Sequence, residues 1–136
     1  MTIVTDRGFA VDDWQGGFAT PDNLAANDAT PAVDLASDTD PEVLQDHLPN
    51  IPMIRVDFPS FADGRGFSIA RRLRDMGFKG RLRAKGHVIA DQYAMARRSG
   101  FDEVEIAEDL AARQPEEQWL ARANWRAHDY QSRLRA

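Results

Sequence analysis

The sequence contains no cysteine, and this absence excludes several chemistries at once. Disulfide bonds, thiolate nucleophiles, iron–sulfur clusters held by thiolates and cysteine-type zinc sites all require that residue. The sequence also lacks an apolar run near the roughly eighteen residues of a membrane span. Residues Met1 to Asp13 do not have the basic-then-apolar order of a signal peptide. We therefore expect a cytoplasmic protein without membrane contact.

What is present is the composition of an ordinary globular domain. The chain has 136 residues, of which 43% are hydrophobic and 29% are charged, and a length of this order fits one domain. We expect an irregular arm or a hairpin over residues 1–30 and a single α/β domain over residues 31–136. Because Trp14 and Phe18 are unfavourable in water, part of the arm should dock on the core or on a second subunit.

Charge is distributed unevenly along the chain. Residues 1–50 hold ten acids and one base, residues 51–100 hold four acids and eleven bases, and residues 101–136 hold eight acids and five bases. A basic segment can bind nucleic acid, but few aromatic residues accompany these bases, and the flanking segments supply a larger acidic excess. We therefore favour neutralisation within the chain over nucleic-acid binding.

Strand and helix patterns alternate over residues 51–106. A β-branched apolar run predicts a first strand that is covered on both faces, and apolar residues at helical spacing follow it. Connections of this length make the strands parallel, with right-handed crossovers. The predicted fold is a β-α-β-α-β parallel core that resembles part of a (β/α) barrel or a small doubly wound sheet. The predicted strands cover residues 51–58, 80–85 and 101–106, and the predicted helices cover 67–76 and 88–99.

Further helices are expected on both sides of this core. Asp40 as an N-cap predicts a short helix that continues to His47. Residues 108–113 predict another, and Pro115 opens a helix to about Arg133. Three or four strands are too few to close a barrel, so their edges must be covered. We expect either a homodimer or cover by the N-terminal arm and the C-terminal helix.

Ligands of parallel α/β sheets bind where the strands end and the following helices begin. The loop from Asp63 to Ser68 has glycines for close backbone approach, free amides at a helix start, a guanidinium and a hydroxyl, which together can hold an oxyanion. Two long cations share one face of the second strand, and in a buried strand they require an anion or a carboxylate. The candidate ligand-binding residues are Asp63, Gly64, Arg65, Gly66, Ser68, Arg83, Lys85 and Asp91.

These residues also have a structural interpretation. Asp63 or Ser68 would then cap the helix start. Arg65 would pair with Asp57, and the two cations of the second strand would pair with Asp57 and Asp91.

Catalytic residues are not identified by any motif. His87 and Asp57 are the candidates, because histidine can take up and release a proton near neutral pH and a carboxylate can act as a base. His47 and His128 lie far from His87 in the sequence, so no three-histidine metal site is expected. No cofactor is expected either.

Four motifs within residues 58–106 carry a family resemblance. They are Phe58-Pro59-x-Phe61-x-Asp63-Gly64-Arg65-Gly66-Phe67-Ser68, Leu82-Arg83-Ala84-x-Gly86-x-Val88, Asp91-Gln92 and Gly100-Phe101-Asp102. With these motifs the chain resembles a bacterial domain-of-unknown-function family, number nine hundred thirty-four. Its members look like small cytoplasmic proteins encoded beside assimilatory sulfite reductase, and they are often described as oxidoreductases in sulfite reduction.

The resemblance implies a pathway rather than a mechanism. Many relatives carry a cysteine before the Gly-Phe-Asp motif, where this chain has Ser99, so thiol chemistry is not expected. Without a dinucleotide or haem motif, nothing in the sequence holds an electron. We expect an accessory protein of assimilatory sulfite reduction that binds a small oxyanion or docks on sulfite reductase or its electron-supply protein. The alternatives are a barrel-like enzyme acting on an anionic metabolite and a non-catalytic dimeric adaptor.

Overall fold

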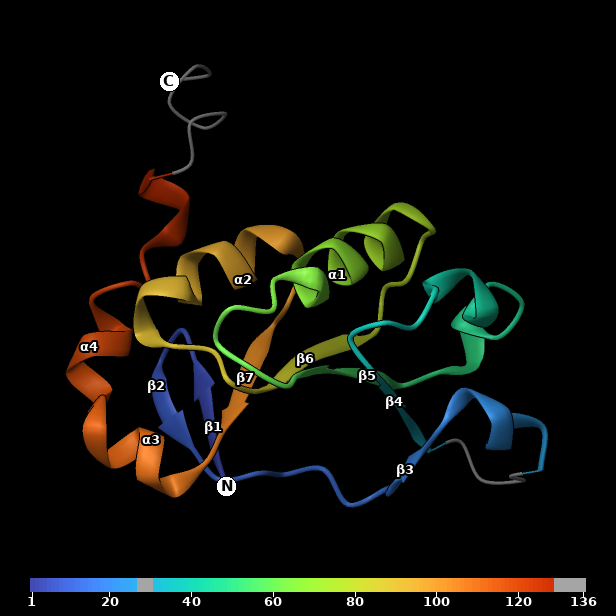
Figure 1. Ribbon diagram of the computed structural model, residues 1–136, viewed down its shortest axis with the longest axis horizontal. Helices are drawn as coiled ribbons and strands as arrows, with labels where there is room; N and C mark the ends of the chain where they lie inside the picture. The colour runs from blue at the N-terminus through green and yellow to red at the C-terminus, as the bar shows by residue number, and fades with distance from the viewer. Residues whose placement is uncertain (27–30, 129–136) are drawn as a thin grey trace.

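The computed structural model describes residues 1–26 and 31–128, and a single sheet of seven strands runs through this part of the chain (Figure 1). The strands are β1 (Thr2–Thr5), β2 (Gly8–Ala10), β3 (Phe18–Ala19), β4 (Ala32–Leu35), β5 (Met53–Phe58), β6 (Arg81–Gly86) and β7 (Glu103–Ile106). Their order across the sheet is β2-β1-β7-β6-β5-β4-β3. Strands β3 to β7 pair in parallel, whereas β1 is antiparallel to both β7 and β2.

Helices follow the parallel strands and flank the N-terminal hairpin. The α-helices are α1 (Arg65–Asp75), α2 (Tyr93–Ser99), α3 (Glu108–Arg113) and α4 (Glu116–Leu120), and the 3-10 segments are η1 (Pro21–Ala26), η2 (Pro41–Leu44), η3 (Leu48–Asn50), η4 (Ala90–Gln92) and η5 (Trp125–His128). The predicted α/β class and the parallel β5-α1-β6-α2-β7 core are confirmed. None of the helices in the described residues has the length and apolar character that a bilayer crossing requires.

The sheet is wound in one direction only. Strands β4, β5, β6 and β7 are neighbours in chain order, so each crossover moves the same way along the sheet. Right-handed crossovers in one direction place their helices on one face, and Figure 1 shows α1 and α2 side by side above the sheet. A doubly wound sheet reverses direction and has helices on both faces. The parallel strands therefore share the one-directional winding of a (β/α) barrel, within an open sheet that has β2 and β3 at its edges.

The hydrophobic core lies between the sheet and helices α1 and α2. Ile54, Val56 and Phe58 of β5 are at most 1% exposed and belong to the same buried cluster as Phe67 and Leu73 of α1. Because side chains alternate along a strand, the residues between them point to the opposite face. Burial of this apolar cluster is the main source of the stability of the helix-covered side.

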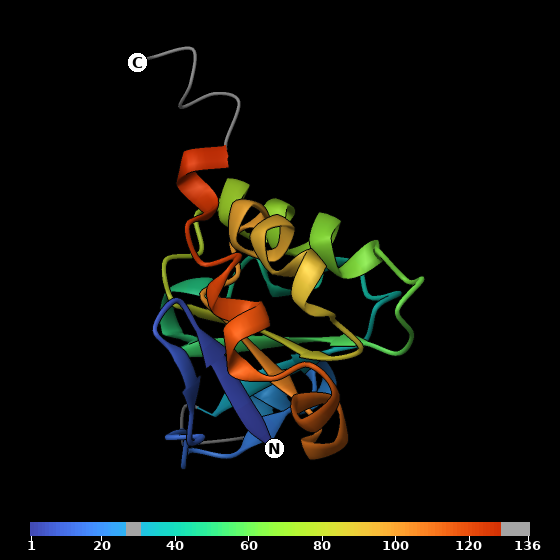
Figure 2. The same ribbon diagram turned by 90° about the vertical axis from the view of Figure 1, so that its left-hand side faces the viewer.

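The opposite face of the sheet is polar. On this face of β5, Met53 is buried and Arg55 is half-buried, but Asp57 is exposed. The expected cover of this strand on both faces is therefore incomplete at its carboxyl end. Residues 11–17 cross this face, from β2 at one edge of the sheet to β3 at the other (Figures 1 and 2). These residues are only a part of the N-terminal segment 1–30, and from here on the arm means residues 11–17 alone.

The first residues of the chain form a hairpin, one of the two arrangements expected for them. Strands β1 and β2 pair with each other, and β1 pairs with β7, so the hairpin covers the β7 edge. Glu116 of α4 accepts a hydrogen bond from the backbone N–H of Phe9 in β2 at 2.8 Å. Cover of the sheet edges by the N-terminal segment and a C-terminal helix was one of the two alternatives predicted from the sequence. The division into residues 1–30 and 31–136 stays a prediction, although β1, β2 and β3 join the common sheet.

Two predicted helices are shorter than expected. Asp40 caps η2 by accepting the N–H of Glu42 at 3.0 Å, but this segment is a 3-10 helix that ends at Leu44. The helix predicted over residues 88–99 begins as η4, becomes α-helical at α2, and ends before Gly100, whose φ of 118° stops it as expected.

The helix predicted from Pro115 to about Arg133 is not formed as one unit. Helix α4 ends at Leu120, and residues 121–124 form turns and bends before η5 begins. The remainder of the predicted helix, residues 129–133, lies outside the described residues.

The two tryptophans of this region explain the turn. Trp119 is 1% exposed and its ring lies edge-to-face on Tyr93, with centroids 6.2 Å apart. Trp125 instead donates its indole N–H to Asp6 at 3.4 Å and stacks under the Arg97 guanidinium. Residues six apart differ in direction by about 120° on an unbroken helix. The chain therefore turns between the two rings so that both contact the folded body.

Asp6, which accepts the indole N–H of Trp125, also binds two side chains of α2. Its carboxylate accepts hydrogen bonds from the Tyr93 hydroxyl and from Arg97 and Trp125. Burial raises the pKa of Asp6, but these hydrogen bonds and the Arg97 charge outweigh burial and lower the pKa below its usual value. The carboxylate joins the β1–β2 turn to α2 and η5.

Candidate functional site

Arg83 lies on the polar face of the sheet and is fully buried. Its guanidinium donates to Glu103 at 2.6 Å, to Glu105 at 2.8 Å and, through both terminal nitrogens, to Asp12 at 3.0 and 3.1 Å. Burial lowers the pKa of Arg83, but the hydrogen bonds and charges of these carboxylates outweigh burial and raise it. Arg83 is therefore neutralised within the chain.

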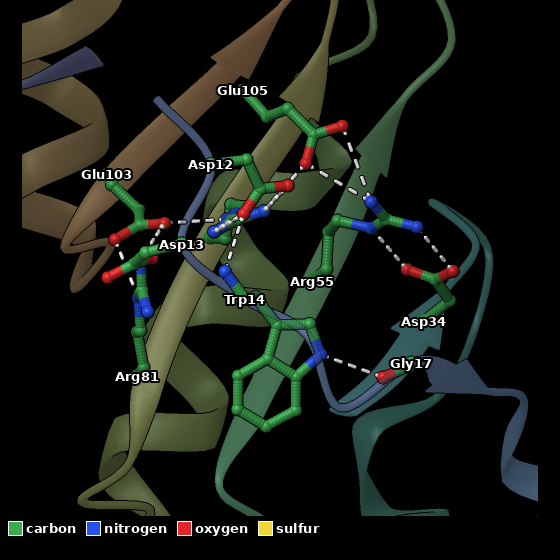
Figure 3. A network of polar contacts seen from close by, with 10 residues as sticks. Asp12, Asp13, Trp14, Gly17, Asp34, Arg55, Arg81, Glu103 and Glu105 are labelled. Carbon is green, nitrogen blue, oxygen red and sulfur yellow. Dashed lines mark hydrogen bonds and ion pairs between the residues drawn. The ribbon is translucent and has the colours of Figure 1, made fainter. Parts of the chain in front are cut away.

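The carboxylates that Arg83 requires were predicted, but their identity was not. The expected partners were Asp57 and Asp91, whereas Asp91 pairs with Arg122 at 2.7 Å. The same network extends along the face to Arg55, paired with Asp34 and Glu105, and to Arg81, paired with Glu103 and Asp13 (Figure 3).

The arm docks on this network through side chains. The hydrogen bond from Arg83 lowers the pKa of Asp12 despite partial burial. Trp14 donates its backbone N–H to Asp12 at 2.9 Å and its indole N–H to the carbonyl oxygen of Gly17 at 2.8 Å (Figure 3). Docking of the arm on the body of the protein was the first of the two alternatives expected for Trp14.

In the folded chain, the basic segment of residues 51–100 is neutralised by ion pairs with the two acidic segments that flank it in the sequence. At least six arginines of residues 51–100 form ion pairs with carboxylates of the acidic flanking segments. They are Arg55, Arg72, Arg74, Arg81, Arg83 and Arg97.

The candidate loop from Asp63 to Ser68 contains the first turn of helix α1, which begins at Arg65 with Gly64 as its N-cap residue. Asp63 accepts the backbone N–H of Arg65 at 3.1 Å and pairs with its guanidinium at 2.8 Å. These hydrogen bonds hold the pKa of Asp63 well below its usual range. Arg65 also donates to the hydroxyl of Ser37 at 3.0 Å. Asp63 therefore satisfies a backbone amide at the helix start, although the N-cap residue is Gly64, and the partner of Arg65 is Asp63 and not Asp57.

The second candidate glycine of this loop, Gly66, is required by packing. A Cβ at Gly66 would lie 2.4 Å from the ring of Phe58, whereas a Cβ at Gly64 would meet nothing closer than 3.8 Å. The Phe58 ring also lies 4.9 Å from that of Phe67, centroid to centroid. Gly66 lets α1 approach β5.

The Gly100-Phe101-Asp102 motif is also structural. Asp102 accepts the N–H of Leu82 at 2.9 Å and a hydrogen bond from Arg74 at 3.0 Å, and Arg74 donates to the carbonyl oxygen of Gly100. Phe101 is fully buried. The motif therefore ties α1, β6 and the start of β7 together.

A cavity of about 290 Å³ lies at the carboxyl ends of β5, β6 and β7, and we call it the carboxyl-end pocket. Three candidate residues from the sequence, Asp57, Lys85 and His87, line it. Helix α3 adds the charged pair Asp109 and Arg113, whose side chains lie 3.6 Å apart. The apolar wall of the pocket consists of Met1, Pro59, Phe61, Ala107 and Leu110.

Lys85 differs from the neighbouring arginines. In the described part of the chain, no acidic group lies within the 4.0 Å that defines an ion pair with Lys85. Asp57 is its cross-strand neighbour in the β5–β6 register, and it too forms no ion pair with the residues that the structure describes. Lys85 is thus the candidate cation whose ammonium group stays available to a ligand.

His87 is oriented by the end of β5. Its backbone N–H donates to the Phe58 carbonyl oxygen at 3.0 Å, and its Nδ1 lies 3.1 Å from the same oxygen. A carbonyl oxygen only accepts hydrogen bonds, so Nδ1 carries the proton and Nε2 of the neutral ring is an acceptor. The ring packs edge-to-face with Phe61, centroids 4.9 Å apart. With Nδ1 directed at this carbonyl oxygen, Nε2 is the ring nitrogen that can accept a hydrogen bond from a ligand.

The structure does not bring together all the candidate cations. Arg65 is held by Asp63 and Ser37 at the start of α1, Arg83 is held under the arm, and neither lines the carboxyl-end pocket. The candidate cations Arg65, Arg83 and Lys85 therefore do not converge on one site, because acidic neighbours hold the two arginines in different places. The predicted ligand role of the loop residues and of Asp91 stays a prediction.

Sequence reasoning missed Phe61, Leu110 and Arg113 as pocket residues. Phe61 follows a predicted strand by three positions, so the rule of carboxyl-end loops could have identified it. The two residues of α3 become neighbours of β5 only through the order of strands in the sheet.

Fold and pocket together define an α/β protein with an open, mostly parallel sheet and a ligand-sized cavity at the carboxyl edge of its parallel strands. Residues 32–136 match the sequence model of the family described as "Bacterial protein of unknown function (DUF934)". The chain belongs to this family, as the motifs implied. No curated protein shows a significant match to it.

Proposed function

We propose that this chain is a cytoplasmic accessory protein of assimilatory sulfite reduction that binds a small oxyanion in the carboxyl-end pocket. The observation that carries the binding proposal is Lys85, a pocket cation without an acidic partner in the described residues. The pathway is proposed from the family resemblance. A donor such as a lysine ammonium forms strong, charge-assisted hydrogen bonds with an oxyanion.

The other charged groups of the pocket set limits on the ligand. Asp57 and Asp109 balance Lys85 and Arg113, and His87 adds a positive charge only when it is protonated. A small anion of low charge suits this balance better than a polyphosphate. The anion would pair with Lys85 and accept a further hydrogen bond from protonated His87.

Binding can be measured by calorimetry with sulfite, sulfate and phosphate. We expect binding to the natural chain and binding at least about tenfold weaker to Lys85→Met, because a hydrogen bond to a charged group is lost. Lys79→Met is the matched control, since Lys79 is an exposed lysine that lines a different cavity. No heat with any of the three anions would refute the binding proposal.

The proposed partner is sulfite reductase or its electron-supply protein, and the proposed assembly is a homodimer. The purified proteins can be tested for association by sedimentation, with and without sulfite. A monomer that associates with neither protein would remove both proposals and leave anion binding to stand alone.

A second candidate function is an enzyme that acts on an anionic metabolite. It is favoured by the presence of Lys85 and two proton-accepting groups, His87 and Asp57, around one pocket. Lys85 would hold the anionic group while His87 Nε2 or Asp57 removes a proton. Proton exchange at carbon in candidate ligands, followed by NMR in deuterated water, would reveal this activity, and His87→Gln should abolish it if His87 is the base.

A further inference from the structure

The carboxyl-end pocket is larger than a bare oxyanion. Its volume is about 290 Å³, while a water molecule takes up about 30 Å³ of the liquid. Sulfite and sulfate are one sulfur atom with three or four oxygens, so either would leave most of the pocket to solvent. A ligand that fills the pocket must therefore have a body in addition to its anionic group.

The walls indicate the character of that body. Phe61 is 41% exposed, although a large aromatic side chain is unfavourable in water. Its ring meets the His87 ring edge-to-face, so the two rings form a corner rather than a stack. Pro59 and Leu110 continue the apolar wall. These side chains match a flat apolar group, and ligand pockets commonly combine such a wall with a few polar groups.

Lys85 lies where this pocket borders a second cavity. That cavity, of about 240 Å³, is also lined by Lys85 and Asp57, together with Thr20 and the paired residues Asp34 and Arg55. The shared residues place Lys85 at the border between the two cavities, at one side of the carboxyl-end pocket. Phe61 belongs to the carboxyl-end pocket and not to the second cavity.

We infer that the ligand of the carboxyl-end pocket is an anion with a flat apolar body, of the class of aromatic sulfonates, phosphates or carboxylates. Its anionic group pairs with Lys85 and its ring lies against Phe61 and Leu110. This inference rests on the proposed function in one respect, namely that Lys85 binds an anion.

The test compares probes that differ in one feature at a time. Sulfate and methanesulfonate carry the anionic group with little or no body, benzenesulfonate adds a ring, and benzenesulfonamide keeps the ring without the charge. Amide NMR titration of the full chain yields a dissociation constant for each. We expect benzenesulfonate to bind at least about tenfold more tightly than methanesulfonate, because the ring leaves water for an apolar wall.

Variants separate the two halves of the site. Phe61→Ala should remove the preference for benzenesulfonate and leave sulfate binding unchanged, whereas Lys85→Met should weaken all three anions. Met95→Ala is the matched control, since Met95 is exposed to a similar extent but lines a different pocket. Circular dichroism of each variant checks that the fold is kept.

Each outcome decides between the two proposals. Equal affinity for sulfate and benzenesulfonate would overturn the inference and leave the proposed function intact. Equal affinity for benzenesulfonate and benzenesulfonamide would show that the pocket binds rings without using Lys85, which overturns anion binding. Binding of none of the four probes would overturn both.

Discussion

Asp12 and Arg83 are 71 residues apart in the chain, and their side chains meet through two hydrogen bonds of 3.0 and 3.1 Å on the polar face of the sheet. This contact fastens the arm and buries the guanidinium. Glu103 and Glu105 hold the same guanidinium from β7. Arg83 therefore serves the fold, and Lys85, two residues later on the same strand, is the cation that reaches a pocket.

Removal of the Asp12 carboxylate should lower the free energy of unfolding only moderately. Asp12→Asn leaves Glu103 and Glu105 on Arg83, and Asp12 is partly exposed, so we expect a loss of about 1 kcal/mol in the free energy of unfolding. Urea denaturation measures this loss. Asp13→Asn is the control, since this side chain is 71% exposed and should change little. A loss as large for Asp13 as for Asp12 would contradict the role of the Asp12 contact.

Removal of the guanidinium should be far more damaging. Arg83→Met leaves two buried carboxylates without one of their cations, and breaking a buried ion pair in this way costs about 3–5 kcal/mol. Lys85→Met removes no ion pair in the described residues and should stay within about 0.5 kcal/mol of the natural chain. Thermal and urea unfolding of the two variants provide the comparison. Similar losses for both would show that Lys85 is also a structural cation.

Stability should fall in acid through Asp6 and Asp12. The folded pKa of each carboxyl lies below its usual value, so the stability that each provides is present above the unfolded pKa of about 3.9. It is lost as the pH falls through the folded pKa, because the unfolded chain binds protons first. Melting temperatures between pH 7 and pH 2 measure the effect. The double variant Asp6→Asn, Asp12→Asn should lose less stability on acidification than the natural chain, and an unchanged acid slope would argue against these two groups.

Gly64 and Gly66, at the start of α1, should differ in how well they tolerate substitution by alanine. Gly66→Ala places a Cβ against the Phe58 ring and should cost about 1–3 kcal/mol through overpacking. Gly64→Ala meets nothing closer than 3.8 Å and serves as the control. Thermal unfolding compares them. Equal tolerance would mean that the Phe58 ring can move aside.

Local patterns predicted the centre of the fold well. Alternation along residues 81–85 separated Leu82 and Ala84 from the three cations, and the structure has the same two faces. Gly100 ended a helix as expected, because its positive φ is a local property of the backbone. The pattern after Pro115 failed, since the turn before η5 depends on contacts of Trp119 and Trp125 with distant residues.

The candidate site was predicted in part. The rule that ligands bind at the carboxyl ends of parallel strands selected Asp57, Lys85 and His87, and all three line the carboxyl-end pocket. A separate argument, that two long cations on one face of a buried strand require an anion, selected Arg83, whose partners come from residues 12, 103 and 105. A strand pattern shows that a cation is present, but it does not show which distant carboxylates reach it.

The sequence by itself determined the order of strands and helices over residues 51–106, the parallel direction of that core and the need of a buried arginine for carboxylates. These follow from side-chain periodicity and from the cost of burying a charge, which are properties of short segments. Only the tertiary structure decided that the hairpin of residues 2–10 pairs with β7, that the arm neutralises Arg83 and that Lys85 stays unpaired in the described residues. Such pairings depend on distances between residues remote in the chain, and those distances exist only after the sheet has formed.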